Sequence, residues 1–199
     1  MTIKRGAPWG EPVVAPVDTL EVRSDGELAA AVSGGEPRPV LVRGGDVHRS
    51  LGAPSGASAT TKVPIDVIHL TADDRRLTAV AHVVARRRGR TGWWRGPIIA
   101  VMNVDHIGAW DVAPRAHPND GWLDVVDVSE SMSSRARWQA WRRLPTGNHL
   151  PHPDISSRRT RAETFTFSQP LGLWVDGVRC GTVQMLSLEV SPDAAEFYL

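Results

Sequence analysis

The stretch Asn103–Val128 holds the residues of this chain that are best placed to do chemistry. Its sequence is NVDHIGAWDVAPRAHPNDGWLDVVDV, in which a loop with Pro114 and Pro118 leads to the Asp120-Gly121 pair. Strand-like apolar segments stand on both sides of the loop, and Asp120 places a carboxylate in its turn. Ordering such a loop costs chain entropy, so it suits either a hairpin corner or a loop that holds a cation.

A second candidate surface lies in residues 86–95, with the sequence RRRGRTGWWR. Guanidinium and indole groups occur together on surfaces that bind membranes or single-stranded nucleic acid. The alternative is a solvated loop with one or both tryptophans packed into the core. The net charge of +1 gives the whole protein no general attraction to nucleic acid, which argues against nucleic acid as a partner.

Length and composition favour one globular domain. The chain has 199 residues, of which 41% are hydrophobic, which is enough for one well-buried core. Cys180 is the single cysteine, so no internal disulfide can form, as expected in a reducing compartment. The N-terminus lacks the apolar segment of a signal peptide, and no run approaches the roughly 18 apolar residues of a transmembrane helix. We therefore expect a soluble, cytoplasmic protein.

Hydrophobic patterning predicts many short strands and few helices. Ser24 and Glu27 form a capping box ahead of the apolar run Leu28–Val32, which predicts a short helix. A helical turn is expected over residues 46–51, and a longer helix over Ser133–Leu144. Strands are predicted at residues 19–23, 39–43, 63–70, 77–84, 97–103, 123–128, 163–168, 171–175 and 182–190, with an edge at 196–199. This spacing predicts a mainly β (α+β) protein built on an antiparallel sandwich or barrel.

The stretch that begins at Asn103 also resembles a known family. It is similar to the C-terminal domain of the diacylglycerol kinase and sphingosine kinase superfamily, including its soluble bacterial lipid kinases. The matching positions are Asn103, Gly108, Pro114, Ala116, Pro118, Asp120, Gly121, Leu123, Asp124 and Val125. The resemblance covers Leu20 onward and implies the family's antiparallel β-sandwich over residues 53–199. It further implies a short β-α-β remnant of the nucleotide-binding domain over residues 19–52, after an irregular arm at 1–18.

The resemblance places the family's glycine-rich phosphate loop at residues 23–28. Asp25 and Gly26 match this loop, but Arg and Ser replace two of its glycines, and Glu27 puts a carboxylate where phosphates would lie. The family also has a longer segment ahead of the loop, so we expect half of the ATP cleft to be absent and do not expect ATP as a cofactor. A capped helix start explains the same residues without any nucleotide.

A second family signature, in the hinge region, is matched here by Asp46 and Arg49, but the Asn and Thr that meet nucleotide and substrate in the family are not kept. The alternative for these two residues is an ion pair between positions i and i+3 of one helical turn, worth a few tenths of a kcal/mol.

The resemblance also implies a structural magnesium site in residues 117–122. Asp120 would be its carboxylate ligand, and the backbone carbonyls of His117 and Trp122 would complete it, which suits the hard oxygen ligands that Mg²⁺ prefers. The competing explanation is a turn in which the Asp120-Gly121 pair supplies a positive φ.

The family's general base is matched by Asp176, which is therefore the candidate catalytic residue. The glutamate that assists this base in the family is replaced by Val178. Asp176-Gly177 is also a favoured pair for a type I′ hairpin, so folding alone explains both residues.

These departures lead to three hypotheses. The first is a diacylglycerol-kinase-like protein without a complete ATP site, which binds a lipid or a partner chain, alone or as a homodimer. The second is a lipid kinase that phosphorylates a lipid alcohol once a partner chain completes its ATP cleft. The third is a nucleic-acid or membrane-surface binder that uses residues 86–95.

Overall fold

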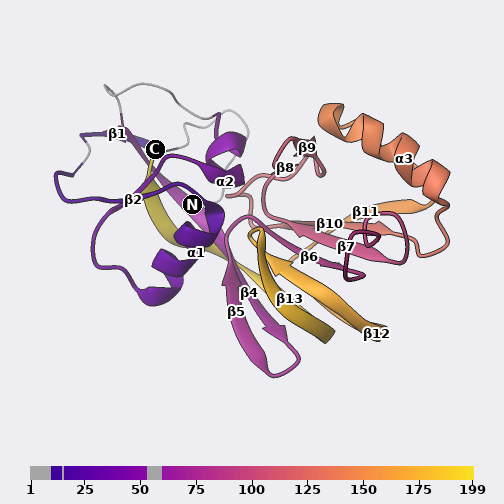
Figure 1. Ribbon diagram of the computed structural model, residues 1–199. Coiled ribbons are helices and arrows are strands. Elements are labelled where there is room, and N and C mark those ends of the chain that lie inside the picture. Colours follow the sequence, from indigo (N-terminus) through magenta and orange to yellow (C-terminus); the bar gives the residue numbers. More distant parts are fainter. Residues whose placement is uncertain (1–9, 15, 53–59) are drawn as a thin grey trace.

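The computed structural model describes residues 10–14, 16–52 and 60–199, and these form the mainly β fold that the sequence predicts (Figure 1). Its elements run in the order β1 (Glu11–Val13), β2 (Leu20–Val22), α1 (Asp25–Gly34), β3 (Val40–Val42), α2 (Gly45–Ser50), β4 (Thr60–Ala72), β5 (Arg75–Ala79), β6 (His82–Arg86), β7 (Ile98–Met102), β8 (His106–Ile107), β9 (Trp110–Asp111), β10 (Leu123–Val128), α3 (Ser134–Arg143), a 3₁₀ turn (Leu144–Thr146), β11 (Ile155–Thr160), β12 (Ala162–Val175) and β13 (Val178–Tyr198).

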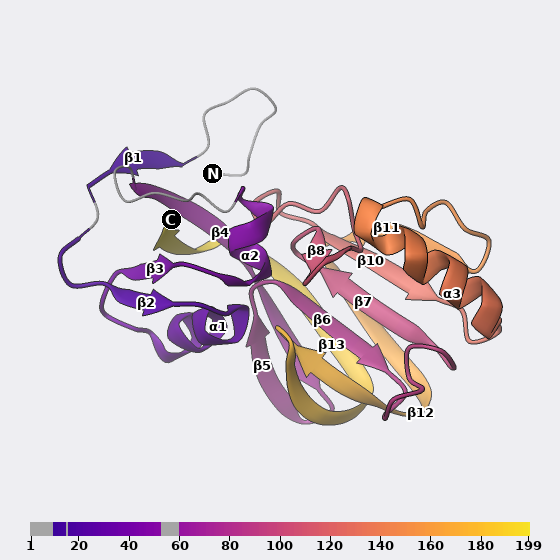
Figure 2. The same cartoon turned by 45° about the horizontal axis from the view of Figure 1, so that its top comes forward.

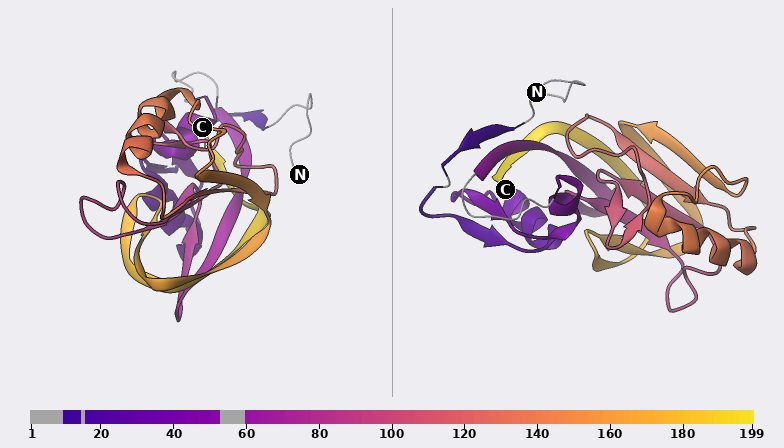
Figure 3. Two further views of the ribbon diagram at one scale, coloured as in Figure 1. Left: turned by 90° about the vertical axis from the view of Figure 1, so that its right-hand side faces the viewer. Right: turned by 90° about the horizontal axis from the view of Figure 1, so that it is seen from above.

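One large sheet carries most of these strands. Its main path runs β1-β4-β13-β12-β6-β7-β10-β11, with every neighbouring pair antiparallel. The sheet curls over, as the end-on view in Figure 3 (left) shows, so that strands from both of its halves enclose one core. Leu70 of β4, Val125 of β10 and Leu173 of β12 all belong to this core and are at most 3% exposed. The predicted antiparallel sandwich is confirmed.

The N-terminal part packs at one end of the sheet, and α3 lies at the other (Figure 2). Strands β2 and β3 pair in parallel, and Leu41 of β3 pairs in parallel with Tyr198 at the end of β13. Helix α1 begins as predicted: the Ser24 hydroxyl accepts the Glu27 N–H at 3.3 Å, and the Glu27 carboxylate accepts the Arg23 N–H at 2.7 Å. Gly35 ends the helix with a φ of 62°, a conformation that glycine adopts without strain.

Helix α3 covers the outer face of β7 and β10. Ala140 of the helix belongs to an apolar cluster with Ala100 of β7 and Val126 of β10. The helix begins at the Ser133 cap, close to the start predicted from the spacing of its tryptophans.

Two long strands run through both the sandwich core and the N-terminal core. Ile68 of β4 and Leu188 of β13 lie in the sandwich core, whereas Ile65 of β4 and Phe197 of β13 lie in a second core with α1 and β3. The predicted division at residue 53 stays a prediction, because residues on both sides of that position share this second core.

The sequence divides these long strands incorrectly. The predicted strands 163–168 and 171–175 are one strand, β12, in which the pairing with β13 shifts between Thr166 and Leu171. Pro170 lies inside that irregularity, where a missing N–H donor costs no regular ladder bond. In the same way, the predicted segments 182–190 and 196–199 belong to β13, except that β13 ends at Tyr198, and this strand has an irregularity after Ser191.

The arm predicted to be irregular contains a strand. Residues 11–13 form β1 and pair with residues 60–62 of β4. The remainder of the prediction, on residues 1–9 and 15, lies outside the described residues. None of the described helices is long and apolar enough to cross a membrane.

The shared second core predicts that the N-terminal part and the sandwich unfold together. Replacing the fully buried Phe197 with alanine should lower the free energy of unfolding by about 3–5 kcal/mol, because it leaves a cavity between β13 and the N-terminal elements. Urea denaturation should show a single transition at a lower midpoint. Glu196→Ala, which removes a surface ion pair to Lys62, is the control and should cost less than about 1 kcal/mol. Two separate transitions in the wild-type protein would contradict the coupling.

Candidate functional site

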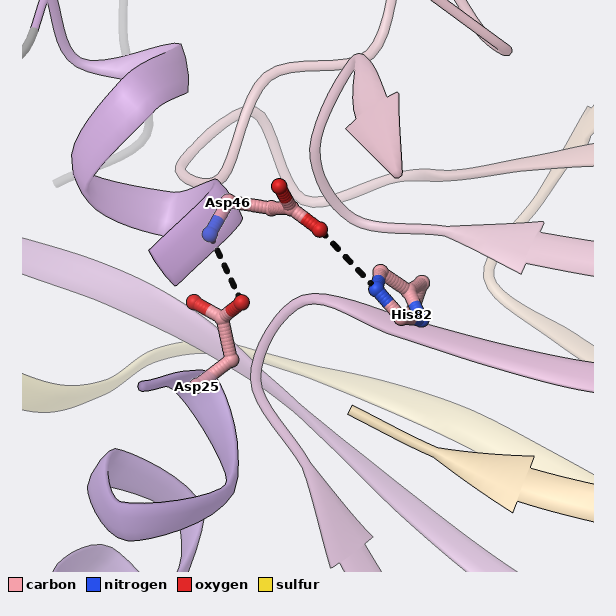
Figure 4. Close-up of side chains that lie close together, drawn as sticks. All are labelled: Asp25, Asp46 and His82. Atoms are coloured by element: carbon pink, nitrogen blue, oxygen red, sulfur yellow. Dashed lines mark hydrogen bonds and ion pairs between the residues drawn. The ribbon is translucent and has the colours of Figure 1, made fainter. Parts of the chain in front are cut away.

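Three of the side chains singled out in the sequence converge around His82, at the junction of the N-terminal part and the sandwich. Asp25 starts α1, Asp46 lies in α2, and Asp176 lies in the turn between β12 and β13. Figure 4 shows Asp25, Asp46 and His82 pointing toward one another. Asp25 and Asp176 lie 151 positions apart in the sequence, so only the fold brings these residues together.

Asp25 joins the starts of two helices. Its carboxylate accepts the backbone N–H groups of Asp46 at 2.7 Å and of Val47 at 3.0 Å, so it caps α2. This contact needs a close approach of the two chains: a Cβ atom on Gly45, whose φ is 92°, would lie 2.4 Å from the Asp25 carboxylate. Burial raises the pKa of Asp25, against the effect of the two hydrogen bonds.

Asp46 pairs with the imidazole of His82 across the junction. The Asp46 Oδ2 atom lies 3.2 Å from His82 Nε2, and the carboxylate also accepts the Gly108 N–H at 2.9 Å. Burial opposes ionisation of both partners, yet their hydrogen bond lowers the pKa of Asp46 and raises that of His82. The two groups therefore stabilise each other as an ion pair.

Arg49 does not form the predicted ion pair with Asp46. Both residues lie in α2, but Asp46 turns toward His82 while Arg49 is exposed, and no contact within 4 Å joins them in the described part of the chain. The correction has a physical cause: the buried imidazole and the Gly108 N–H offer Asp46 stronger partners than a solvated guanidinium does.

Asp176 holds the backbone that leads into β6. Its two carboxylate oxygens accept the N–H groups of Val80, Ala81 and His82, each at 2.9 Å. Burial raises the pKa of Asp176 to about 6, although these hydrogen bonds and the charge of His82 oppose the rise. Asp176 and Gly177 have φ values of 48° and 77°, as the predicted hairpin requires. The role of Asp176 as a general base stays a prediction.

The hairpin of Asp176 closes against the turn that the resemblance assigns to phosphates. A Cβ atom on Gly26 would lie 3.0 Å from a methyl group of Val178, the residue that replaces the family's glutamate. Ser24 and the Glu27 carboxylate already accept hydrogen bonds at this helix start. The turn therefore has a side chain packed against its glycine and carries a negative charge, which disfavours phosphate.

Asp120 lies apart from this group, in the loop before β10. Its Oδ1 atom accepts the Trp122 N–H at 3.0 Å, and its Oδ2 atom pairs with the guanidinium of Arg159. A carboxylate that is already neutralised by a guanidinium does not fit a magnesium ion, which needs an anionic ligand of its own. The predicted magnesium site, which would also use the carbonyls of His117 and Trp122, stays a prediction.

Among the buried polar residues that sequence reasoning missed are Asp66 and His82. Asp66 is fully buried, and its carboxylate accepts the Gly121 N–H at 2.6 Å and the Asp193 N–H at 3.0 Å. His82 is 3% exposed. Each stands in an otherwise apolar run, VPIDVI and TAVAHVVA. That interruption was a usable signal, because a buried charge persists only where partners satisfy it.

The polar group could hold a divalent cation. Asp25, Asp46 and His82 each offer one ligand atom, and these atoms lie within 4.8 Å of one another. Two carboxylates and an imidazole suit metals such as zinc or manganese. The carboxylate oxygens already accept backbone N–H groups, however, so a cation would share ligands that the fold uses to join α1 and α2.

A second site lies beneath α3, where an apolar cavity of about 250 Å³ separates the helix from β7 and β10. Trp93, Trp94, Trp110 and Trp141 line it, together with aliphatic side chains and with two polar residues, Arg137 and His149. His149 is 3% exposed, and the backbone of Val112 lies beside its ring, but neither ring nitrogen makes a hydrogen bond of normal geometry in the described structure. Burial lowers the pKa of His149, so its imidazole is neutral at physiological pH.

The ion pair of His82 predicts a pH dependence of stability. Its folded pKa lies above the ordinary value of 6.5, so this contribution is complete below that value and is lost as the pH rises through the folded pKa. Between about pH 6 and 8, stability should therefore fall more steeply, or rise less, in the wild type than in His82→Gln, by at most about 1.4 kcal/mol per pH unit.

Urea denaturation at several pH values measures this difference. His48, His117 and His149 have pKa values lowered by burial and affect both proteins alike. Asp176 has a pKa of about 6 and still titrates at the lower end of this range, so the slopes are compared above pH 7. Equal slopes in the two proteins would show that His82 is not charged in the folded state.

The pairing of Asp120 with Arg159 predicts that magnesium does not stabilise the protein. Neither millimolar Mg²⁺ nor a chelator should change the melting temperature of the wild type, because the guanidinium occupies the carboxylate. Differential scanning calorimetry would measure this, with Asp120→Asn as the matched variant. A rise in melting temperature with Mg²⁺ that Asp120→Asn abolishes would restore the predicted site.

Comparisons with known proteins agree with this fold. The model of the YegS C-terminal NAD kinase beta sandwich-like domain matches residues 70–198, which is well over half of the chain. A putative diacylglycerol kinase from Bacillus anthracis str. Sterne superposes with a TM-score of 0.66 at 14% sequence identity, over 90% of this chain and 77% of the other. A second solved structure, described as a diacylglycerol kinase from the same organism, gives a TM-score of 0.62 at 14% identity, over 90% and 75% of the two chains.

No curated protein matches the sequence. At identities this low the solved structures establish the fold alone, while the matched family model covers most of the sandwich. The chain therefore belongs to the family of the YegS C-terminal NAD kinase beta sandwich-like domain.

Proposed function

We propose that this protein is a non-catalytic member of the diacylglycerol kinase-like superfamily and that it binds a lipid in the cavity beneath α3. The observation that carries the proposal is the cavity itself. Its volume is about 250 Å³ and its walls are almost entirely indole and aliphatic side chains. Burying an alkyl chain in such a site gains about 0.8 kcal/mol for each CH₂ group, so an acyl chain suits it better than a polar ligand does.

The buried His149 favours an amphiphilic ligand over a pure hydrocarbon. The backbone of Val112 can satisfy at most one ring nitrogen of this buried imidazole, so part of its hydrogen-bonding capacity stays unsatisfied. A ligand with a hydroxyl or carbonyl group near this end of the cavity would satisfy it. This is the chemistry of a fatty alcohol, a fatty acid or an acylglycerol.

The absence of catalysis is supported by how the polar residues are used. The Asp176 oxygens each accept backbone N–H groups, and Val178 lies against Gly26 at the turn assigned to phosphates. Three of the roughly four acceptor positions of the carboxylate are thus used by the backbone, which leaves little capacity for a general base. An ATP-dependent reaction would also need a phosphate cradle, and the carboxylate of Glu27 works against one.

Binding can be followed by the fluorescence of the tryptophans that line the cavity. Titration of 1-decanol or 1-decanoylglycerol into the wild type should give a saturable change in emission. Ala140→Leu adds bulk to the cavity wall and should weaken binding roughly tenfold or more. Ala30→Leu makes the same change at an exposed position of α1 and should leave binding unchanged. Equal affinity in all three proteins would exclude the cavity as the site.

The role of His149 has its own test. His149→Phe keeps a ring of similar shape but removes both nitrogens. Affinity for 1-decanol should fall about fivefold, the value of one hydrogen bond, while affinity for decane should stay the same or rise. An equal loss for both ligands would mean that the substitution disturbs packing instead.

The kinase alternative is tested on the same protein. Incubation with ATP, Mg²⁺ and diacylglycerol should yield no phosphatidic acid. Product formation that Asp176→Asn abolishes would overturn the non-catalytic assignment. Activity that appears only with an added partner chain would favour a cleft completed in trans.

A further inference from the structure

We propose that α3 and the loop between β6 and β7 (residues 87–97) form one face that docks onto an anionic lipid bilayer, with the cavity opening toward it. We call this the docking face. The inference deepens the proposed function, on which it rests, by naming the bilayer as the source of the lipid.

The buried Arg137 makes the helix and the loop a single unit. Its guanidinium donates to the carbonyl of Gly96 in the loop, at 2.5 Å, and to the carbonyls of Ser129 and Met132 before the helix, at 2.7 and 3.1 Å. Ser134 at the start of α3 donates to the carbonyl of Trp94, at 3.4 Å. Figure 3 (right) shows the loop and α3 on the same side of the molecule. The face is therefore held rigid before any partner arrives.

The docking face is strongly basic although the whole chain has a net charge of only +1. No acidic residue occurs between positions 75 and 104 or between positions 131 and 153. The exposed arginines of the face are Arg87, Arg88, Arg90, Arg95, Arg135, Arg142 and Arg143. In the described structure only Arg87 among them forms an ion pair, with the exposed Glu130 at 3.3 Å. Such a concentration of unpaired guanidinium groups complements a surface of phosphate headgroups.

Large aromatic side chains are exposed among these charges. Trp138 and Trp141 of α3 are 46% and 44% exposed. Indoles prefer the boundary between headgroups and acyl chains, where their apolar body and polar N–H are both satisfied. Trp138 also lies three and four positions from Arg135 and Arg142, so these residues share one side of the helix.

Trp141 marks the opening of the cavity. It lines the cavity and contacts Trp94 edge to face, with ring centroids 6.2 Å apart, yet nearly half of its surface meets solvent. A side chain that is both wall and surface lies at the mouth. An acyl chain leaving a bilayer on this side would therefore pass Trp141 without crossing water.

Nucleic acid fits the same charges less well. Base stacking needs a free ring face, but Arg142 lies over the ring of Trp138, with its guanidinium carbon 4.9 Å from the centroid, and Trp94 and Trp141 occupy each other. An apolar opening in the middle of the face also gives nucleic acid no advantage.

Sedimentation with lipid vesicles tests the proposal. The wild type should sediment with phosphatidylcholine vesicles that contain phosphatidylglycerol, and not with phosphatidylcholine alone. The double variant Arg142→Glu/Arg143→Glu should lower the partition coefficient roughly tenfold or more, and Trp138→Ala several-fold. Arg76→Glu/Arg179→Glu makes the same change in charge at exposed positions of β5 and β13 and should bind like the wild type.

The outcome is separable from the test of the cavity. Trp138 does not line the cavity, so Trp138→Ala should keep its affinity for 1-decanol while it loses vesicles. Ala140→Leu should do the reverse. Loss of 1-decanol binding alone would therefore count against the cavity and not against the docking face.

Failure of the wild type to bind anionic vesicles, or equal binding by both double variants, would overturn the proposal. Binding of a single-stranded oligonucleotide that depends on Arg142 and Arg143, without vesicle binding, would overturn it in favour of nucleic acid.

Discussion

A buried carboxylate that is satisfied by backbone N–H groups organises the centre of this protein. Asp176 fixes the backbone of residues 80–82, and that backbone aims the imidazole of His82 at Asp46. Asp46 in turn holds α2, whose first N–H groups are capped by Asp25 at the start of α1. Each contact is modest by itself, but the buried groups depend on one another, because any one left unpaired would bear the full cost of its desolvation.

The two sites differ in what remains free to react. In the polar group the carboxylate oxygens are already acceptors for the fold's own N–H groups. In the cavity beneath α3, by contrast, the imidazole of His149 makes no hydrogen bond of normal geometry, and the backbone of Val112 can satisfy at most one of its two ring nitrogens. A buried polar group whose hydrogen-bonding capacity is unused indicates a ligand site better than charged side chains that are already hydrogen-bonded within the protein. This contrast is the reason that the proposed function moves from the polar group to the cavity.

Local patterns carried much of the fold. The capping box at Ser24 and the tryptophan spacing of α3 placed two helices, since both depend on neighbours in sequence. The sandwich was expected from strand spacing and from the motif beginning at Asn103. The continuity of β12 and β13 was not foreseen, because their irregular pairing resembles a break when only one chain is read. The meeting of His82 with Asp46, and of Arg159 with Asp120, depends on contacts between distant segments that no local pattern encodes.

The long strands have a mechanical consequence. Enzymes that close over two substrates commonly move one domain against another about a few residues that absorb the change in backbone angles. Here β4 and β13 lie side by side across both cores, with paired residues from Lys62 and Tyr198 at one end to Ala72 and Leu186 at the other, and with one irregularity between Ser191 and Ala195. Bending at the junction would break the hydrogen bonds between β4 and β13 and expose two apolar cores at once. The N-terminal part is thus rigidly connected to the sandwich, and the molecule should bind its ligands without a movement of one part against the other.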